Sequence, residues 1–174
     1  MLDAATLLIF PLLMAFAGFS DMFTMQISNR VSLLLVAAFL ALAVATGMPL
    51  EAIGWHLSCG FGVLLITFTL FVIGTVIPAA RFGAGDAKLM AATAVWMGWG
   101  NMMDYFVAAS LLGGVLTLFI YKARSLPLPD ALQRQAWIAR LHNVGEGVPY
   151  GIALGAAAIM VYPSTAIWLT AILR

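Results

Sequence analysis

The chain has 174 residues, of which 64% are hydrophobic and only 9% are charged, and its net charge at neutral pH is +1. Soluble domains usually carry about 25% charged residues, so this composition excludes an ordinary soluble fold and indicates an integral membrane protein. No basic run of the kind that binds a nucleic-acid backbone is present, so we expect no nucleic-acid partner.

Apolar runs recur along the whole chain and predict transmembrane helices. A helix needs about 20 apolar residues to cross the hydrocarbon core of a bilayer. Pro11 lies inside the first run, where neighbouring helices can tolerate a kink, and Pro78 ends the third run. The fourth run is short and rich in Ala and Met. We therefore expect an all-α, polytopic membrane protein with a single domain over residues 1–174 and six transmembrane helices at about 4–23, 31–46, 53–77, 87–99, 105–121 and 148–173.

Basic residues divide the connections between these spans into two classes. The first, third and fifth connections contain all of them except Arg174, and the second and fourth connections contain none. Cytoplasmic loops carry the excess of Lys and Arg, so we expect these three connections in the cytoplasm and both termini outside it. The residues concerned are Arg30, Arg81, Lys88, Lys122, Arg124, Arg134 and Arg140.

The fifth connection contains a pattern that predicts a helix on the membrane surface. From Asp130 to about His142, apolar residues can share one helical face while arginines lie among the polar positions. We expect one cytoplasmic amphipathic helix that lies at the interface. Alternatively, this helix flanks the mouth of a functional site.

Two acidic residues lie where expected spans meet the cytoplasmic side. Asp21 is near the end of the first run, and Asp86 follows the polar, glycine-rich break that begins at Arg81. An ionisable residue at the membrane edge is costly, and its default interpretation is functional. Two aspartates that share a proton can activate a water for peptide hydrolysis, one as the base and the other as the acid that polarises the carbonyl. Such a pair titrates as a unit, so the base is not assigned to either residue.

The residues around Asp86 and Asp21 have possible supporting roles. Gly83 and Gly85 lack a Cβ, so we expect that the backbone can adopt positive φ there and that a substrate strand can approach closely. Lys88 either neutralises local charge or sets the topology, and Asn29 either caps the second helix or contacts substrate.

These residues resemble the motifs of a known family. The segment 83–89, Gly-Ala-Gly-Asp-Ala-Lys-Leu, is similar to the GxGD-x-K-L signature of the type IV prepilin peptidases, which are membrane aspartyl proteases. Asp21, Ile27 and Asn29 are similar to the D-x5-I-x-N pattern that follows the family's first catalytic aspartate. Pro-Tyr-Gly at 149–151 is a third, shorter match.

The resemblance implies removal of a short basic leader from prepilin precursors at the cytoplasmic face of the bacterial inner membrane. It implies that Asp21 and Asp86 are the catalytic pair, and we expect support from Gly83, Gly85, Lys88, Asn29, Pro149 and Tyr150. Larger members carry a zinc-binding domain with paired cysteines and also methylate the new N-terminus. This chain has one cysteine, Cys59, and resembles the short branch that processes Flp-type pilins. We therefore expect no metal, no cofactor and no methyltransferase activity.

Two other functions remain open for the same acids. A small proton-coupled transporter would need acids near the midplane and internal repeats, and the two halves of the chain do not match. An inactive subunit of a pilus or secretion machine is compatible with the sequence. A further acid, Glu146, is near the cytoplasmic end of the last span; we expect a solvated loop residue, although it could reach a basic leader.

Overall fold

The computed structural model describes residues 2–77 and 83–173, and every regular element in these ranges is helical. The elements are α1 (Leu2–Thr24), α2 (Asn29–Ala45), α3 (Leu50–Val76), α4 (Ala84–Arg124), α5 (Asp130–Gln133), α6 (Ala136–His142), α7 (Tyr150–Val161), η2 (Tyr162–Ser164) and α8 (Ala166–Ile172). The expected all-α class is therefore confirmed. Pro78 and Arg81, which the sequence analysis used to end a span and to orient a connection, lie outside the described residues.

The first half of α4 is the buried centre of the helical bundle. Residues 91–98 are all buried, and the small side chains of the alanines among them allow neighbouring helices to approach closely. The indole N–H of Trp96 donates to the carbonyl of Leu35 in α2 at 2.9 Å. The Trp96 ring also lies 5.0 Å from the ring of Phe10 in α1 and 5.9 Å from that of Tyr162 in η2. This one side chain thus joins three elements to α4.

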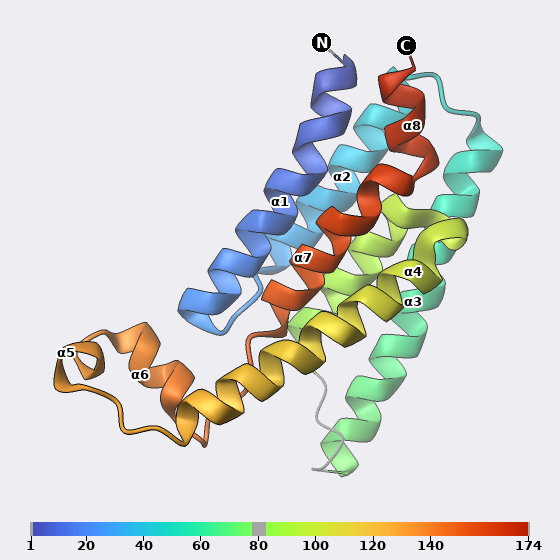
Figure 1. Ribbon diagram of the computed structural model, residues 1–174. Coiled ribbons are helices and arrows are strands. Elements are labelled where there is room, and N and C mark those ends of the chain that lie inside the picture. The colour runs from blue at the N-terminus through green and yellow to red at the C-terminus, as the bar shows by residue number, and fades with distance from the viewer. Residues whose placement is uncertain (1, 78–82, 174) are drawn as a thin grey trace.

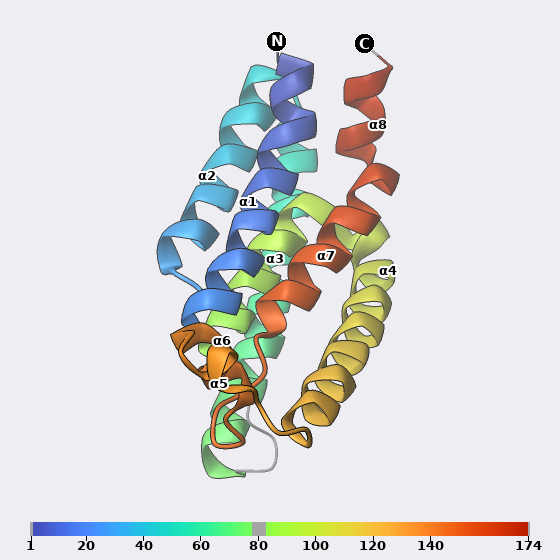
Figure 2. The same ribbon diagram turned by 60° about the vertical axis from the view of Figure 1, so that its left-hand side comes forward.

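A backbone break at Gly98 divides α4 into two halves. Gly98 has φ 63° and ψ 174°, a combination that is essentially restricted to glycine. His56 of α3 lies against it, and its Nδ1–H donates to the carbonyl of Val95 at 2.8 Å. The two halves of α4 leave this break in different directions (Figures 1 and 2). The expected spans 87–99 and 105–121 therefore both lie in α4, one on each side of the break.

The expected count of six spans is not confirmed. Among the described residues, three helices are long and apolar enough to cross a membrane: α1, α3 and α4. A fourth span results if α7, η2 and α8, which bend by 54°, are counted as one. The α2 helix is apolar but has only 17 residues. The expected count of six includes α2, which is shorter than about 20 residues, and it takes the two halves of α4 as separate spans.

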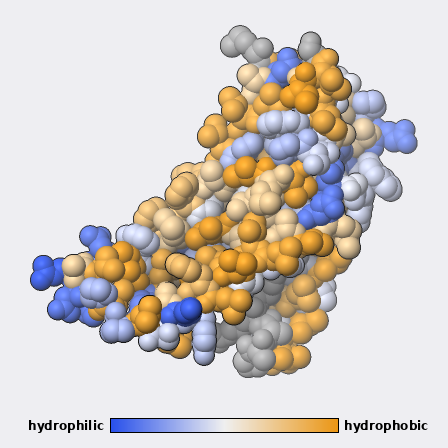
Figure 3. Space-filling view, viewed as in Figure 1, coloured by the Kyte–Doolittle hydropathy of each residue, from blue (hydrophilic) through white to orange (hydrophobic). Residues whose placement is uncertain are grey.

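The two ends of the molecule differ in character. Both termini lie at one end, and α5 and α6 lie toward the other end (Figures 1 and 2). On the face seen in Figure 3, the surface between the ends is mostly hydrophobic, and hydrophilic side chains gather over α5 and α6. Large apolar side chains on α1, such as Leu12 and Phe16, are exposed, as expected for residues that face lipid. The placement of the two ends relative to the cytoplasm remains a prediction.

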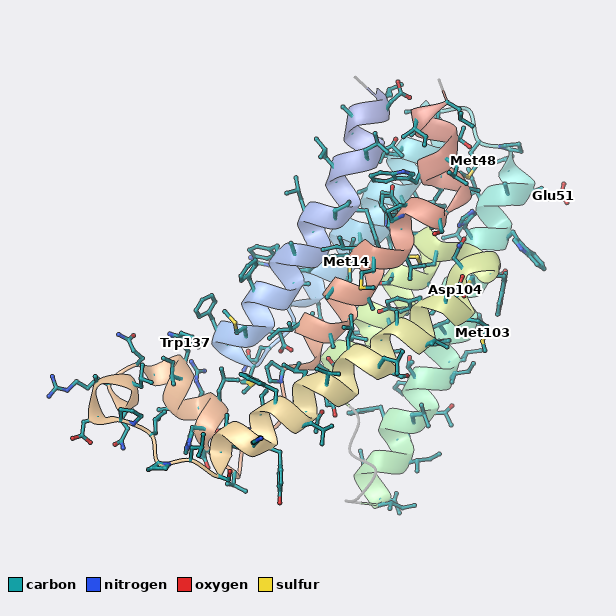
Figure 4. The ribbon with its side chains drawn as sticks, viewed as in Figure 1. Met14, Met48, Glu51, Met103, Asp104 and Trp137 are labelled. Atoms are coloured by element: carbon teal, nitrogen blue, oxygen red, sulfur yellow. The ribbon has the colours of Figure 1, made fainter. Side chains whose placement is uncertain are left out.

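The segment 130–142 is not one continuous amphipathic helix, so that prediction is wrong. It forms α5 and α6, which are separated at Arg134 and Gln135. Trp137 of α6 packs edge-on against Phe23 at the end of α1, with ring centroids 5.3 Å apart (Figure 4). Arg140 donates to the carbonyl of Phe23 at 2.8 Å, which satisfies a carbonyl that the helix end leaves without an internal partner. The break lets α6 turn onto the end of α1.

Candidate active site

Asp21 lies in the last turn of α1 and is buried against the start of α7. Its Oδ2 accepts a hydrogen bond from the backbone N–H of Gly151 at 2.8 Å. Gly151 is the second residue of α7, so this N–H has no acceptor within its own helix and lies at the positive end of the helix dipole. A Cβ on Gly151 would lie 2.8 Å from Oδ2, so only glycine allows the carboxylate to come this close.

Asp86 lies in the first turn of α4, next to the glycine-rich segment. The helix begins at Ala84, with Gly83 as its N-terminal capping residue. A Cβ on Gly83 would lie 2.5 Å from Oδ2 of Asp86, so the carboxylate folds back over this glycine. Gly83 has φ −72° and Gly85 is helical, so the expected positive φ at these two positions is wrong. Glycine is required at 83 because of the space that Asp86 occupies.

The two sequence motifs contact each other directly. A Cβ on Gly85 would lie 3.2 Å from Cβ of Ile27, so the connection between α1 and α2 packs on the start of α4. Lys88 donates to the side-chain oxygen of Asn29 at 2.9 Å. Ser28, and not Asn29, caps α2, because the Ser28 hydroxyl accepts from the backbone N–H of Arg30 at 3.3 Å. Lys88 and Asn29 thus link the two segments that carry the aspartates.

A cavity of about 860 Å³ lies between these segments. Its walls come from the end of α1 and the connection after it, the end of α3, the start of α4, and residues 146–150. Asp21 and Asp86 both line it, so one carboxyl group from α1 and one from α4 border the same space.

The other expected site residues divide into two groups. Gly83, Gly85 and Tyr150 line the cavity with the aspartates, and the Tyr150 hydroxyl lies 2.9 Å from that of Thr117. Lys88, Asn29 and Pro149 do not line it. Pro149 is buried and immediately precedes α7.

Sequence reasoning missed one feature of this site. Gly151 was recognised only as part of a short motif, and its N–H is the hydrogen-bond partner of Asp21. Glu146 was expected to be a solvated loop residue that could reach a basic leader; it is exposed, as expected, and it also lines the cavity. Within residues 2–77 and 83–173, no three or more His, Cys, Asp or Glu side chains are grouped so that they could hold a metal ion.

Comparison with known proteins connects this geometry to a family. The model of the type IV leader peptidase family matches residues 8–118, a range that includes both aspartates and the glycine-rich segment. No curated protein and no solved structure matches the chain at a significant level. The family match covers well over half of the chain, so the chain belongs to the type IV leader peptidase family, whose members are proteases of the prepilin peptidase type.

Proposed function

We propose that the chain removes the leader peptide from Flp-type prepilin precursors at the cytoplasmic edge of the bacterial inner membrane, with Asp21 and Asp86 as the catalytic pair. The observation that carries this proposal is that the two aspartates, from α1 and α4, line one cavity. The family match supports the reaction type, and the distribution of basic residues supports the cytoplasmic placement.

The proposed chemistry is general acid–base catalysis of peptide hydrolysis. The ionised carboxylate of the pair takes a proton from a water, and the water oxygen attacks the carbonyl carbon of the scissile bond. The protonated carboxyl donates a hydrogen bond to the carbonyl oxygen and stabilises the charge that develops there. The proton then passes to the leaving nitrogen as the C–N bond breaks. The N–H of Gly151 holds one of these carboxyl groups in a fixed orientation.

The cavity suits a short stretch of peptide. Pockets that bind small ligands measure about 300–1,000 Å³, and this one is about 860 Å³. We propose that the hydrophobic helix of the precursor enters laterally from the bilayer while its leader lies along the cavity. Only residues 25–28 connect α1 to α2, which leaves no room there for an inserted zinc domain and supports the short, Flp-type branch without methyltransferase activity.

The test is a cleavage assay with the protein in lipid vesicles and a purified Flp-type pilin precursor as substrate. Asp21→Asn and Asp86→Asn should each lower kcat by at least about 10²-fold, since each removes a proton-transfer group. Glu51→Gln makes the same chemical change at the exposed start of α3 and should leave activity unchanged.

Full activity in either Asn variant would remove that aspartate from the mechanism. A strain that lacks the chain distinguishes a peptidase from an inactive assembly subunit. If the chain is an inactive subunit, the pilin leader is still cleaved in that strain. We expect the precursor to accumulate with its leader intact.

A further inference from the structure

The cavity carries a third carboxylate, which the proposed chemistry does not use. Glu146 lines the same cavity as Asp21 and Asp86. Among the lining residues that the structure describes, these three are acidic and none is Lys, Arg or His. A cleft with charge of one sign attracts ligand groups of the opposite sign. The described walls of the cavity therefore favour a peptide that carries positive charge.

The backbone at Glu146 is held in place while its side chain is left available. Arg124, at the end of α4, donates to the carbonyls of Leu141 at 2.7 Å, Glu146 at 3.2 Å and Gly147 at 2.8 Å. The N–H of Glu146 donates to the carbonyl of Asn143 at 3.2 Å. No described residue forms a hydrogen bond or an ion pair with the Glu146 carboxylate, and the side chain is exposed. The carboxylate is thus free to bind a group from outside the chain.

The chain itself limits the distance between Glu146 and the catalytic pair. Gly151, which donates to Asp21, is five residues further along. Five residues span at most about 18 Å when fully extended. An extended substrate can cover the same distance with about five residues of its own. A charge that Glu146 binds therefore lies within about five residues of the cleaved bond.

We propose that Glu146 is a specificity-determining residue that binds a Lys or Arg side chain of the leader within about five residues of the cleaved bond. The proposal rests on the proposed function, because it needs a peptide in the cavity. It assigns no part of the proton transfer to Glu146. Loss of the carboxylate should therefore raise KM and leave kcat unchanged.

The experiment uses Flp-type precursors whose leader carries a single Lys, placed in turn at each of the five positions before the cleaved bond. Each precursor is also made with Gln or Glu in place of that Lys. Glu146→Gln should raise KM about fivefold for the best Lys precursor, the upper range for an exposed ion pair, and should leave KM unchanged for the matching Gln precursor. Added salt should reduce the difference.

Two further variants sharpen the test. Glu146→Lys should cleave the Glu precursor better than the Lys precursor, which reverses the preference of the unaltered enzyme. Glu51→Gln is the matched control, since Glu51 is an exposed glutamate that points away from the bundle at the opposite end from α5 and α6 (Figure 4). It should keep the KM and the preference of the unaltered enzyme.

An equal KM for Glu146→Gln and the unaltered enzyme at all five Lys positions would overturn the role of Glu146. So would an equal loss on the Lys and Gln precursors, because that pattern indicates a structural effect. Both results leave cleavage by the unaltered enzyme intact and so leave the proposed function standing. Failure of the unaltered enzyme to cleave any precursor would instead refute the proposed function, and the role of Glu146 with it.

Discussion

Replacing Gly151 by alanine should damage catalysis more than it damages the fold. The added Cβ would lie 2.8 Å from both Cβ and Oδ2 of Asp21 and 3.1 Å from its Cγ. Ordinary carbon contacts begin near 3.5 Å, so the two groups must separate by roughly 0.5–1 Å. The separation weakens or breaks the hydrogen bond from the Gly151 N–H to the Asp21 carboxylate. Bonds to charged groups contribute about 1.5–3 kcal/mol, and crowding of a packed interface costs about 1–3 kcal/mol.

The expected result is a loss in both stability and rate. A misplacement of about 1 Å can lower a catalytic rate about 10²-fold, so kcat should fall between about 10- and 100-fold. The measurement is pilin-precursor cleavage in vesicles, with thermal unfolding in detergent recorded on the same preparation. Far-UV circular dichroism below the unfolding temperature checks that the helices are retained.

Gly155→Ala is the matched control, because it lies one turn further along the same face of α7. Its Cβ would meet the carbonyl of Met14 in α1 at 2.8 Å, so it crowds the same helix pair without touching Asp21. We expect similar destabilisation and a kcat at least about tenfold higher than in Gly151→Ala. Equal losses of kcat in the two variants would refute the reasoning, since the effect would then come from helix packing and not from the carboxylate.

Two further predictions concern the groups that hold the site together. Arg124→Met removes three hydrogen bonds to the carbonyls of residues 141–147, so backbone hydrogen exchange in that segment should accelerate by at least about tenfold, while exchange in α2 stays unchanged. Equal exchange in the variant and the unaltered protein would show that Arg124 does not hold this segment in place. Lys88→Met and Asn29→Ala should each lower kcat/KM by up to about fivefold, because both remove the same exposed hydrogen bond. For the same reason, kcat/KM of the double variant should be no lower than that of either single variant. Independent, multiplying losses would show that the two side chains act separately.

The aspartates could be predicted from the sequence because each stands in a short local pattern. Asp86 follows a glycine-rich break, and Asp21 precedes Ile27 and Asn29 at fixed spacing. The structure brings both onto one cavity and joins the patterns through Lys88 and Asn29. The roles of the neighbours were less predictable. Gly83 was expected to provide positive φ, and it instead makes space for a carboxylate, because the atom that needs the space belongs to a folded-back side chain.

The membrane spans show the same division. Hydropathy located the apolar runs to within a few residues, because each run is a continuous stretch of apolar residues in the sequence. It could not reveal that residues 91–98 are enclosed by other helices or that Gly98 interrupts α4, because burial depends on which helices pack together. The count of six spans is therefore not confirmed: length and composition identify three spans among the described residues, or four if α7, η2 and α8 are counted as one.

Composition and two short motifs by themselves determined the membrane class and the family, and they predicted the aspartate pair, because each of these is written in neighbouring residues. Only the tertiary structure decided that the N–H of Gly151 holds Asp21, that Arg124 braces the segment around Glu146, and that Glu146 lines the cavity. These relations join the ends of α1, α4 and α7, which are distant in the chain. A hydrogen bond of about 3 Å between distant segments exists only when the packing of whole helices brings its two atoms together.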